Sequence, residues 1–224
     1  MWIDDQIMLR CEQALYTKIW QPSSRMVVLG RSNKVESECN KTYCDEHGVA
    51  ILRRSGGGGT VLLGSGCAVI SLGVWVRQYY QNAMYFDLIN QSVVSCLADK
   101  WPQLTELKGS GISDLSYCDQ KIAGTSMFRS RNYLLYQASI LVNEDMEQIE
   151  QTLRHPSAEP EYREGRDHRQ FLSQLGDIVQ GLVATDVCAH LEGFFEIHLK
   201  KQMEKELIEV PRIQTQHILG KVKS

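Results

Sequence analysis

The chain has 224 residues, 43% hydrophobic and 23% charged, which is enough for one large globular domain with a substantial buried core. Its formal net charge of −3 gives no support for a surface that binds nucleic acid or an anionic membrane, and no apolar run is long enough to span a bilayer. The acidic start lacks the features of a signal peptide, and seven cysteines without a CxxC pair favour reduced cytosolic thiols over a zinc site. We therefore expect a cytoplasmic protein.

The first part of the chain predicts alternating helices and strands. Residues 5–19 place apolar side chains at helical spacing, and short apolar runs bounded by turn residues predict strands. We expect helices over residues 5–19, 35–46 and 86–100, and strands over 25–29, 49–53, 60–63 and 67–76. The last two strands are expected to form a hairpin that turns at Gly64-Ser65-Gly66.

The second part of the chain predicts antiparallel strands and then a long helix. The expected elements are strands near 104–108, 113–118, 121–128 and 133–142, a charged surface loop over 155–169, a helix over 185–205 and a loose tail after Pro211. This order predicts an α+β domain with a mixed, largely antiparallel sheet flanked by helices, rather than a doubly wound fold. We place one domain in residues 1–210 and a C-terminal tail in 211–224, with no separate accessory domain.

A basic and glycine-rich segment directly follows the strand predicted at 49–53. Residues 53–60 read Arg-Arg-Ser-Gly-Gly-Gly-Gly-Thr, so backbone N–H groups can close on an anion while a guanidinium neutralises it. Adjacent residues on a strand face opposite sides, so one arginine should point into a site while the other is structural or solvated. The segment matches neither a P-loop nor a dinucleotide fingerprint, and a plain flexible turn remains the alternative.

A second polar segment follows about sixty residues later. Asp114 offers a carboxylate that could hold a metal ion, and Lys121 lies shortly before Gly124. From position alone, Asp114 could equally cap a turn and Lys121 could be a solvated hairpin lysine. Together with the glycine-rich segment, the pair suits an activated carboxylate such as an acyl-adenylate.

Four motifs in the same order resemble those of lipoate-protein ligases, which belong to the biotin/lipoate A/B protein ligase and octanoyltransferase superfamily. The motifs are residues 28–33 with 38–40, residues 53–58, residues 113–115 followed by 121–126, and residues 136–143. The resemblance covers residues 1 to about 200. Biotin ligases share part of it, but their basic loop interleaves glycine and arginine, so the unbroken glycine run favours the lipoate branch.

The resemblance implies an enzyme that adenylates lipoate or octanoate with Mg-ATP and passes the acyl group to a lysine. The implied acceptor is a lipoyl domain of a 2-oxoacid dehydrogenase or the glycine-cleavage H protein. Lys121 is the implied catalytic residue, and Asp114 is a possible Mg ligand or orients the attacking amine. The implied substrate- and adenylate-binding residues are Arg53, Arg54, Ser55, Gly56, Gly57, Gly58, Thr60, Gly124, Thr125 and Ser126.

The sequence departs from the ligase pattern in three ways. Leu62-Leu63 stands where ligases usually carry His-Asp, and Tyr136-Gln137-Ala138 stands for His-His-Gly. Many stand-alone ligases also carry an extra C-terminal domain. These departures leave open a separate accessory subunit, an ATP-independent octanoyl or lipoyl transferase, or a non-catalytic protein that binds lipoyl domains. Cys118 is the thiol nearest Lys121, and we expect it to be structural.

Overall fold

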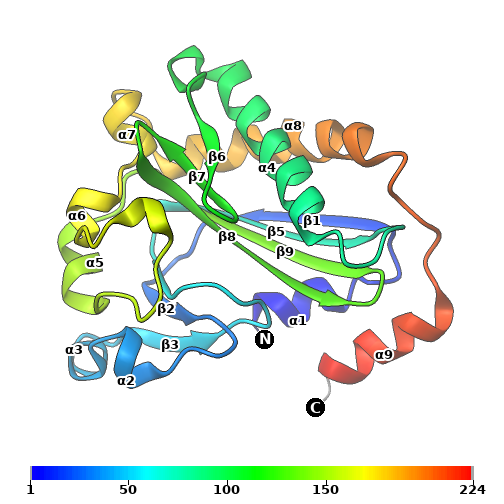
Figure 1. The fold of residues 1–224 in the computed structure, drawn as a ribbon, viewed down its shortest axis with the longest axis horizontal. Coiled ribbons are helices and arrows are strands. Elements are labelled where there is room, and N and C mark those ends of the chain that lie inside the picture. Colours follow the sequence, from blue (N-terminus) through cyan, green and yellow to red (C-terminus); the bar gives the residue numbers. More distant parts are fainter. Residues whose placement is uncertain (1, 223–224) are drawn as a thin grey trace.

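The computed structural model describes residues 2–222, which form a six-stranded antiparallel sheet, a three-stranded sheet and flanking helices (Figure 1). The large sheet has the order β1 (Leu15–Trp20), β5 (Cys67–Trp75), β9 (Tyr133–Leu141), β8 (Gln120–Ser130), β7 (Asp114–Tyr117) and β6 (Lys108–Ser110). The small sheet has the order β3 (Ala50–Arg53), β2 (Met26–Leu29) and β4 (Val61–Leu63). Only the β2–β3 pair is parallel among the described strands. The predicted α+β class is confirmed.

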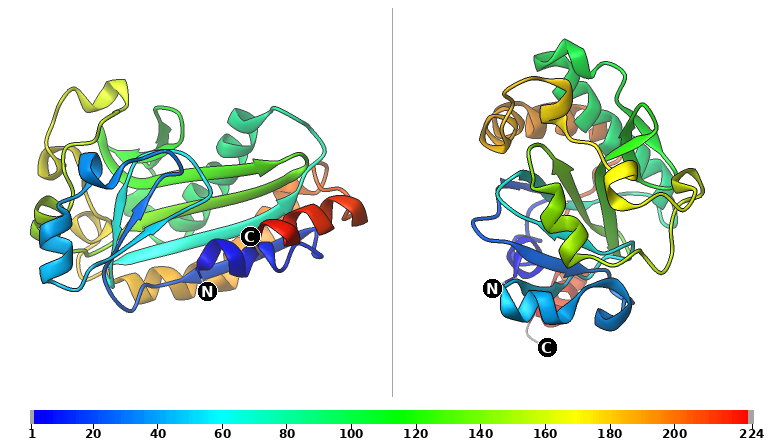
Figure 2. Two further views of the ribbon diagram at one scale, coloured as in Figure 1. Left: turned by 90° about the horizontal axis from the view of Figure 1, so that it is seen from below. Right: turned by 90° about the vertical axis from the view of Figure 1, so that its left-hand side faces the viewer.

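The two faces of the large sheet are covered by different helices (Figure 2). The long helices are α4 (Asn82–Lys100) and α8 (Ala184–Met203) on one face, with α1 (Ile3–Met8) and α9 (Arg212–Val222) on the other. Alternation along β5 produces this layering, because Leu72 and Val74 face the first helix pair whereas Trp75 packs with Tyr133 and Ile7 on the opposite face. The shorter helices are α2 (Val35–Glu38), α3 (Lys41–Glu46), α5 (Met146–Thr152), α6 (His168–Phe171) and α7 (Leu175–Ile178), with 3-10 turns at Pro102–Leu104 and Glu161–Arg163.

The helix expected over residues 5–19 is wrong beyond its first turns. Helix α1 ends at Met8, and Leu15–Trp20 pairs antiparallel with β5 as the edge strand β1. The apolar spacing fits both structures, but Thr17 and Ile19 are β-branched and prefer a pleated sheet. The helix expected over 35–46 is likewise two helices, since Asn40 caps α3 and donates its own N–H to the carbonyl of Thr152.

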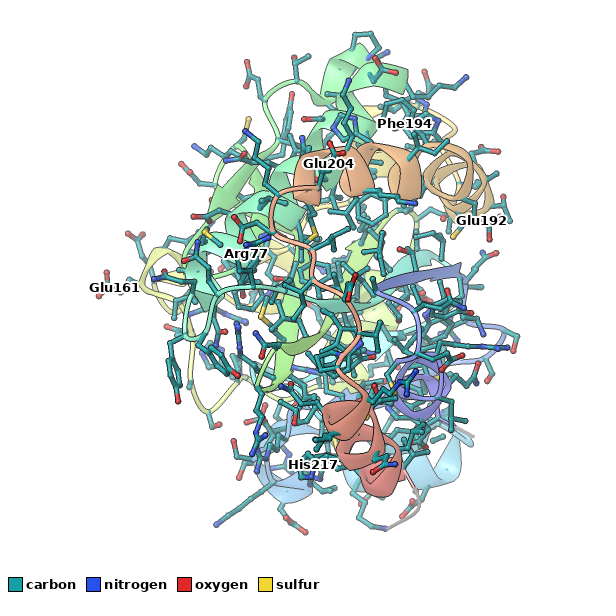
Figure 3. All side chains as sticks on the ribbon, turned by 90° about the vertical axis from the view of Figure 1, so that its right-hand side faces the viewer. Arg77, Glu161, Glu192, Phe194, Glu204 and His217 are labelled. Atoms are coloured by element: carbon teal, nitrogen blue, oxygen red, sulfur yellow. The ribbon has the colours of Figure 1, made fainter. Side chains whose placement is uncertain are left out.

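The end of the chain differs from the expected loose tail. After α8 the chain passes Glu204 and crosses the edge of the molecule to α9, which carries His217 (Figure 3). The crossing segment is fixed by two hydrogen bonds, from Ile208 N–H to the carbonyl of Trp75 and from Arg77 N–H to the carbonyl of Glu206. Ile218 of α9 is 1% exposed and packs in the cluster of Ile7 and Trp75. Residues 223–224 of the expected tail lie outside the described residues.

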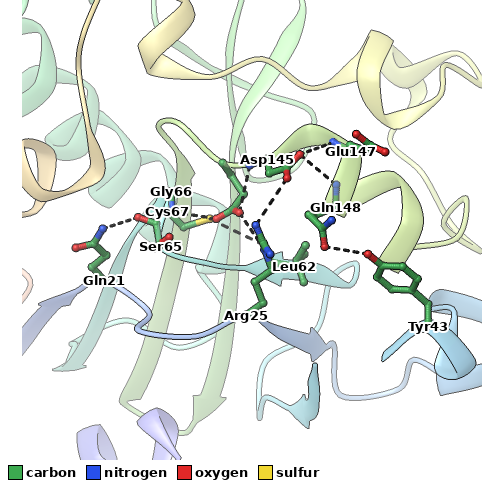
Figure 4. A network of polar contacts seen from close by, with 11 residues as sticks. Gln21, Arg25, Tyr43, Leu62, Ser65, Gly66, Cys67, Asp145, Glu147 and Gln148 are labelled. Carbon is green, nitrogen blue, oxygen red and sulfur yellow. Dashed lines mark hydrogen bonds and ion pairs between the residues drawn. The ribbon is translucent and has the colours of Figure 1, made fainter. Parts of the chain in front are cut away.

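The hairpin expected between residues 60–63 and 67–76 is wrong, because its two strands belong to different sheets. Glu144, which is buried, occupies the turn and accepts a hydrogen bond from Gly66 N–H at 3.0 Å. Gly66, Arg25 and Asp145 belong to the same polar network (Figure 4). A Cβ on Gly64 or Gly66 would collide with Glu144, so both positions need glycine. Arg25 forms an ion pair with this carboxylate, with Nε of Arg25 3.7 Å from Oε1 of Glu144.

Two smaller features also differ from the sequence-based expectation. The strand expected over 104–108 starts only at Lys108, because Pro102–Leu104 form a 3-10 turn that buries Leu104 in the core. Residues 155–169 hold a 3-10 turn and the start of α6, and they cover a cavity rather than forming a free loop. Within residues 2–222, none of the helices is both long and apolar enough to cross a membrane.

Candidate functional site

A cavity of about 1440 Å³ lies between the small sheet, strands β7–β9 and residues 154–172, which we call the lid. Its volume exceeds the ~300–1,000 Å³ of ordinary small-molecule pockets, so it has room for more than one small ligand group. One part of the wall is apolar and includes Trp20, Val28, Leu62, Val69, Leu141 and Ile149. Another part is polar and contains Gly58 and Gly59 of the glycine loop, which we define as residues 55–59, together with Asp114 and Lys121 near the starts of β7 and β8. The cavity can therefore accept a molecule with an apolar tail and a charged head.

The polar wall holds an ion pair between Lys121 and Asp114. Lys121 Nζ lies 2.9 Å from Asp114 Oδ1, and the two side chains are 22% and 13% exposed. Lys121 is the second residue of β8 and Asp114 is the first residue of β7, and a bulge between the strands shifts their register. Tyr162 of the lid donates its hydroxyl hydrogen to Asp114 Oδ2 at 2.9 Å. Burial, and then the charge of Asp114, raises the pKa of Tyr162 far above its ordinary value, so Tyr162 acts only as a neutral donor.

Both arginines of the glycine loop brace the backbone. Arg54 is 7% exposed and donates to the carbonyls of Gly57 and Gly59 at 2.7 and 2.6 Å. Arg53 donates to the carbonyls of Gly30 and Asn33 at 2.9 and 2.7 Å. Burial lowers the pKa of Arg54 to about 10, so it stays charged at neutral pH. Arg54 lines the cavity and Arg53 faces away from it.

Glycine is needed in this region for distinct reasons. A Cβ on Gly30 would collide with the carbonyl oxygen of Gly58, so the loop can pack here only against a bare backbone. Gly58 itself has a φ of +88°, a conformation that side chains disfavour. A Cβ on Gly57 would meet no heavy atom within 4 Å among the described residues. Gly57 is therefore free to approach another molecule.

A carboxylate of α1 ties the glycine loop to the large sheet. Asp4 is 2% exposed, and its two oxygens accept hydrogen bonds from Ser55 N–H at 2.6 Å and from Gln137 Nε2 at 2.9 Å. Burial raises the pKa of Asp4, although both hydrogen bonds and the charge of Arg54 oppose this shift. Asp4 thus connects three separate segments directly behind the cavity wall. Nothing in the sequence-based analysis assigned it a role.

The lid is attached to the domain at both of its ends. Near its start, Ser157 donates its hydroxyl to Glu38, which is 2% exposed. Burial would raise the pKa of Glu38, but the hydrogen bonds from Ser157 and the nearby polar side chains of Thr60 and Asn33 outweigh it and hold that pKa below its ordinary value. Beyond the other end, Ser173 N–H donates to the carbonyl of Lys121 at 3.0 Å. The lid is therefore connected to the same strand that carries Lys121.

The sequence matches the family described as lipoyl protein ligase A/B catalytic domain over residues 4–196. The chain belongs to this family. Its fold is similar to a bipartite lipoate protein ligase of Thermoplasma acidophilum, studied with its E2 lipoyl domain, at TM-score 0.72 and 18% identity over 89% of this chain and 76% of that one. A lipoate-protein ligase A bound with ATP gives a TM-score of 0.70 and 19% identity over 89% and 78%. LipL1 of P. falciparum in complex with lipoate gives a TM-score of 0.65 and 21% identity, over 85% of this chain and 50% of that one.

The structure brings together most, but not all, of the residues that the family motifs indicate. Those that line the cavity are Arg54, Gly58, Thr60, Asp114, Lys121, Gly124, Thr125 and Ser126. Arg53, Ser55, Gly56 and Gly57 are not part of the lining. Ser55 is held from behind by Asp4, and Gly56 accepts a hydrogen bond from Arg31 N–H at 2.9 Å. These four residues shape the loop, and their roles toward a ligand stay predictions.

The positions that depart from the ligase pattern also lie at this cavity. Leu62 and Leu63 line its wall where ligases usually carry His-Asp. Gln137 and Ala138 line it as well, whereas Tyr136 points away into the core and donates to Asn90 at 2.6 Å. The cavity wall of this family member therefore carries fewer titratable side chains than the family motif implies.

The cysteines and the carboxylates limit what chemistry this site can support. No cysteine occurs among the described residues that line the cavity. Cys118 is exposed in the β7–β8 turn, while the remaining cysteines are buried. Among residues 2–222 no cluster of three or more His, Cys, Asp or Glu side chains could hold a metal ion. The described residues therefore do not form a metal site whose ligands all come from protein side chains.

Proposed function

We propose that this protein is a lipoate-protein ligase that adenylates lipoate or octanoate with ATP and transfers the acyl group to a lysine of a lipoyl domain. The observation that carries the proposal is the Lys121–Asp114 pair at one cavity that also contains the glycine loop and an apolar wall. An acyl-adenylate has the same three parts: an apolar tail, a carbonyl bonded to phosphate, and a polar nucleoside. The relatives bound with ATP and with lipoate support this reading.

The proposed reaction has two steps. A carboxylate oxygen of the acyl acid bonds to the α-phosphorus of ATP, and pyrophosphate leaves. The acceptor lysine nitrogen then bonds to the acyl carbon, the bond from that carbon to the phosphate oxygen breaks, and AMP and a proton leave. Lys121 would stabilise negative charge on the carbonyl and phosphate oxygens in both steps. Asp114 would orient the incoming amine after Tyr162 releases one carboxylate oxygen.

Magnesium fits this site only as a companion of the nucleotide. Mg²⁺ in such enzymes often binds one or two carboxylates plus substrate phosphates, and Asp114 could supply one carboxylate. Both oxygens of Asp114 are already paired, one with Lys121 and one with Tyr162. A metal ion bound here would neutralise phosphate charge, and Asp114 would share its remaining lone pairs with that ion.

The absence of a cysteine in the described cavity lining favours the ligase over a transferase that uses a thiol nucleophile. We further propose a lipoyl domain or an H protein as acceptor, with residues 1–210 as the catalytic unit and a separate accessory subunit as a possible partner. The T. acidophilum relative, described as bipartite and studied with its E2 lipoyl domain, supports the lipoyl-domain acceptor and the two-part organisation.

The proposal is tested by adenylate formation without an acceptor. The purified chain is incubated with ATP, Mg²⁺ and octanoate or lipoate, and pyrophosphate release and acyl-AMP are measured. We expect acid-dependent pyrophosphate release and acyl-AMP in both assays. Absence of acyl-AMP with both acids, while the protein is folded and a lipoyl domain still binds, would replace the ligase with a non-catalytic lipoyl-domain-binding protein.

A further inference from the structure

The β6–β7 turn and the lid meet directly above the Lys121–Asp114 pair. Gly111 of this turn has a φ of +57°, and a Cβ there would lie 3.2 Å from the ring of Tyr162 and 3.5 Å from Pro160. Ile112, at the tip of the turn, is 89% exposed and lines the mouth of the cavity. A single exposed apolar side chain is ordinary on a protein surface, but Ile112 lies where it can contact a molecule that approaches the Lys121–Asp114 pair.

The lid side of the same mouth is acidic on its outer surface. Glu161 and Glu164 are exposed and line the mouth, and Glu161 projects from the outline of the molecule (Figure 3). Neither carboxylate forms an ion pair among the described residues. The guanidinium carbons of Arg163 and Arg166 lie over the ring of Phe171, 4.8 and 5.4 Å from its centroid. Ile112, Glu161 and Glu164 together form what we call the rim.

We propose that the rim is the docking surface for the lysine-bearing turn of the acceptor domain. This inference rests on the proposed acyl transfer to a protein lysine. A lysine side chain is only four methylene groups long, so the acceptor backbone must come to the mouth of the cavity for its nitrogen to reach Asp114. Glu161 and Glu164 attract the lysine ammonium group and steer its approach, while Ile112 provides the apolar contact.

The first test is Ile112→Asp, which replaces the apolar contact of the rim with a charge at a position that is 89% exposed at the mouth of the cavity. We expect the KM for an apo-lipoyl domain to rise about tenfold, as for loss of one good interface anchor. Acyl-AMP formation and acyl transfer to hydroxylamine, which needs no docking, should stay unchanged. The matched control is Ile197→Asp, because Ile197 is 75% exposed on α8 and lies outside the cavity lining.

The second test is the double variant Glu161→Gln, Glu164→Gln. We expect a KM for the apo-lipoyl domain that is about threefold higher at low salt and equal to that of the unaltered protein at high salt, because exposed charges act mainly on encounter and are screened. A salt dependence identical to that of the unaltered protein would contradict the electrostatic part of the proposal.

The two possible failures can be told apart. If the unaltered protein forms acyl-AMP and modifies the lipoyl domain, but Ile112→Asp has an unchanged KM, the rim proposal is wrong and the ligase stands. If the unaltered protein forms no acyl-AMP, the ligase proposal is wrong. The rim proposal is then tested by calorimetry, which measures the affinity of the lipoyl domain for the unaltered protein and for Ile112→Asp. Equal affinities for the unaltered and Ile112→Asp proteins would overturn the rim in that case.

Discussion

Lys121 combines a position at the cavity wall with a pairing that fixes its ammonium group against Asp114. Lys121→Met keeps a stem of similar length and removes the cation. We expect acyl transfer to fall about 10²-fold or more, as when one preorganised electrostatic contact is lost. Activity is compared with the melting temperature, and Lys121→Arg serves as the variant that keeps charge. Near-normal turnover in folded Lys121→Met protein would remove Lys121 from catalysis.

Asp4 is a second single residue on which the site depends, because it holds the glycine loop in place through Ser55. Asp4→Ala leaves Ser55 N–H and the amide of Gln137 without their shared acceptor, and an unpaired buried polar group costs about 1–3 kcal/mol. We expect unfolding free energy to fall by about that amount and acyl-AMP affinity to fall with it. Asp4→Asn can still accept from Ser55 N–H, so it should retain most of both quantities. Equal losses in the two variants would show that hydrogen bonding is not the reason.

At the scale of the elements, we expect the lid to make the stability of the fold depend on pH. The responsible residue is His168, which lines the cavity from α6. Burial, followed by the charges of Arg163 and His155, lowers the pKa of His168 to about 4 from an ordinary 6.5. The folded state therefore binds fewer protons than the unfolded chain between these values, so stability is full above pH 6.5 and is lost as the pH falls toward 4. Urea unfolding at pH 7 and pH 5 should show a smaller pH dependence for His168→Gln than for the unaltered protein. The control is His217→Gln on the exposed face of α9; an identical loss in both variants would contradict the assignment.

Helix α9 packs beside α1 on one apolar face of the large sheet. Ile218→Ala should lower the unfolding free energy by about 2 kcal/mol or more, because it empties a buried position beside Ile7 and Trp75. Ile213→Ala on the same helix is the control, since Ile213 is 81% exposed and its truncation should change little. Guanidinium unfolding of the two variants makes the comparison. Equal stabilities would show that α9 does not contribute to the core.

The elements that the sequence predicted best are those whose pattern is local. The strands near 121–128 and 133–142 and the helices near 86–100 and 185–205 are present with shifted ends. The failures depend on distant partners that no local pattern reveals. Residues 15–20 become a strand because β5 pairs with them, and Gly64-Ser65-Gly66 separates two sheets because Glu144 fills the turn.

At the scale of the whole molecule, the topology assembles the cavity from segments that are far apart in sequence. The structure places Lys121, Asp114 and Arg54, which the motifs singled out, at this cavity, and their roles toward a ligand stay predictions. The motifs could not indicate Tyr162, which bonds to Asp114 across 48 residues, or Asp4, which bonds to Ser55 across 51 residues and to Gln137 across 133. Such contacts leave no periodicity or composition signal in a single sequence.

The central claim is that acyl transfer at this cavity consumes ATP and does not pass through an enzyme thioester. The most direct measurement is intact-mass spectrometry of the enzyme and an apo-lipoyl domain incubated with octanoate and Mg²⁺, with and without ATP, and in parallel with octanoyl-carrier protein. We predict an octanoyl mass shift on the lipoyl domain only when ATP is present, and no shift on the enzyme. A lipoyl domain acylated from octanoyl-carrier protein without ATP, with an octanoyl adduct on the enzyme that maps to Cys118 and disappears in Cys118→Ser, would contradict the account.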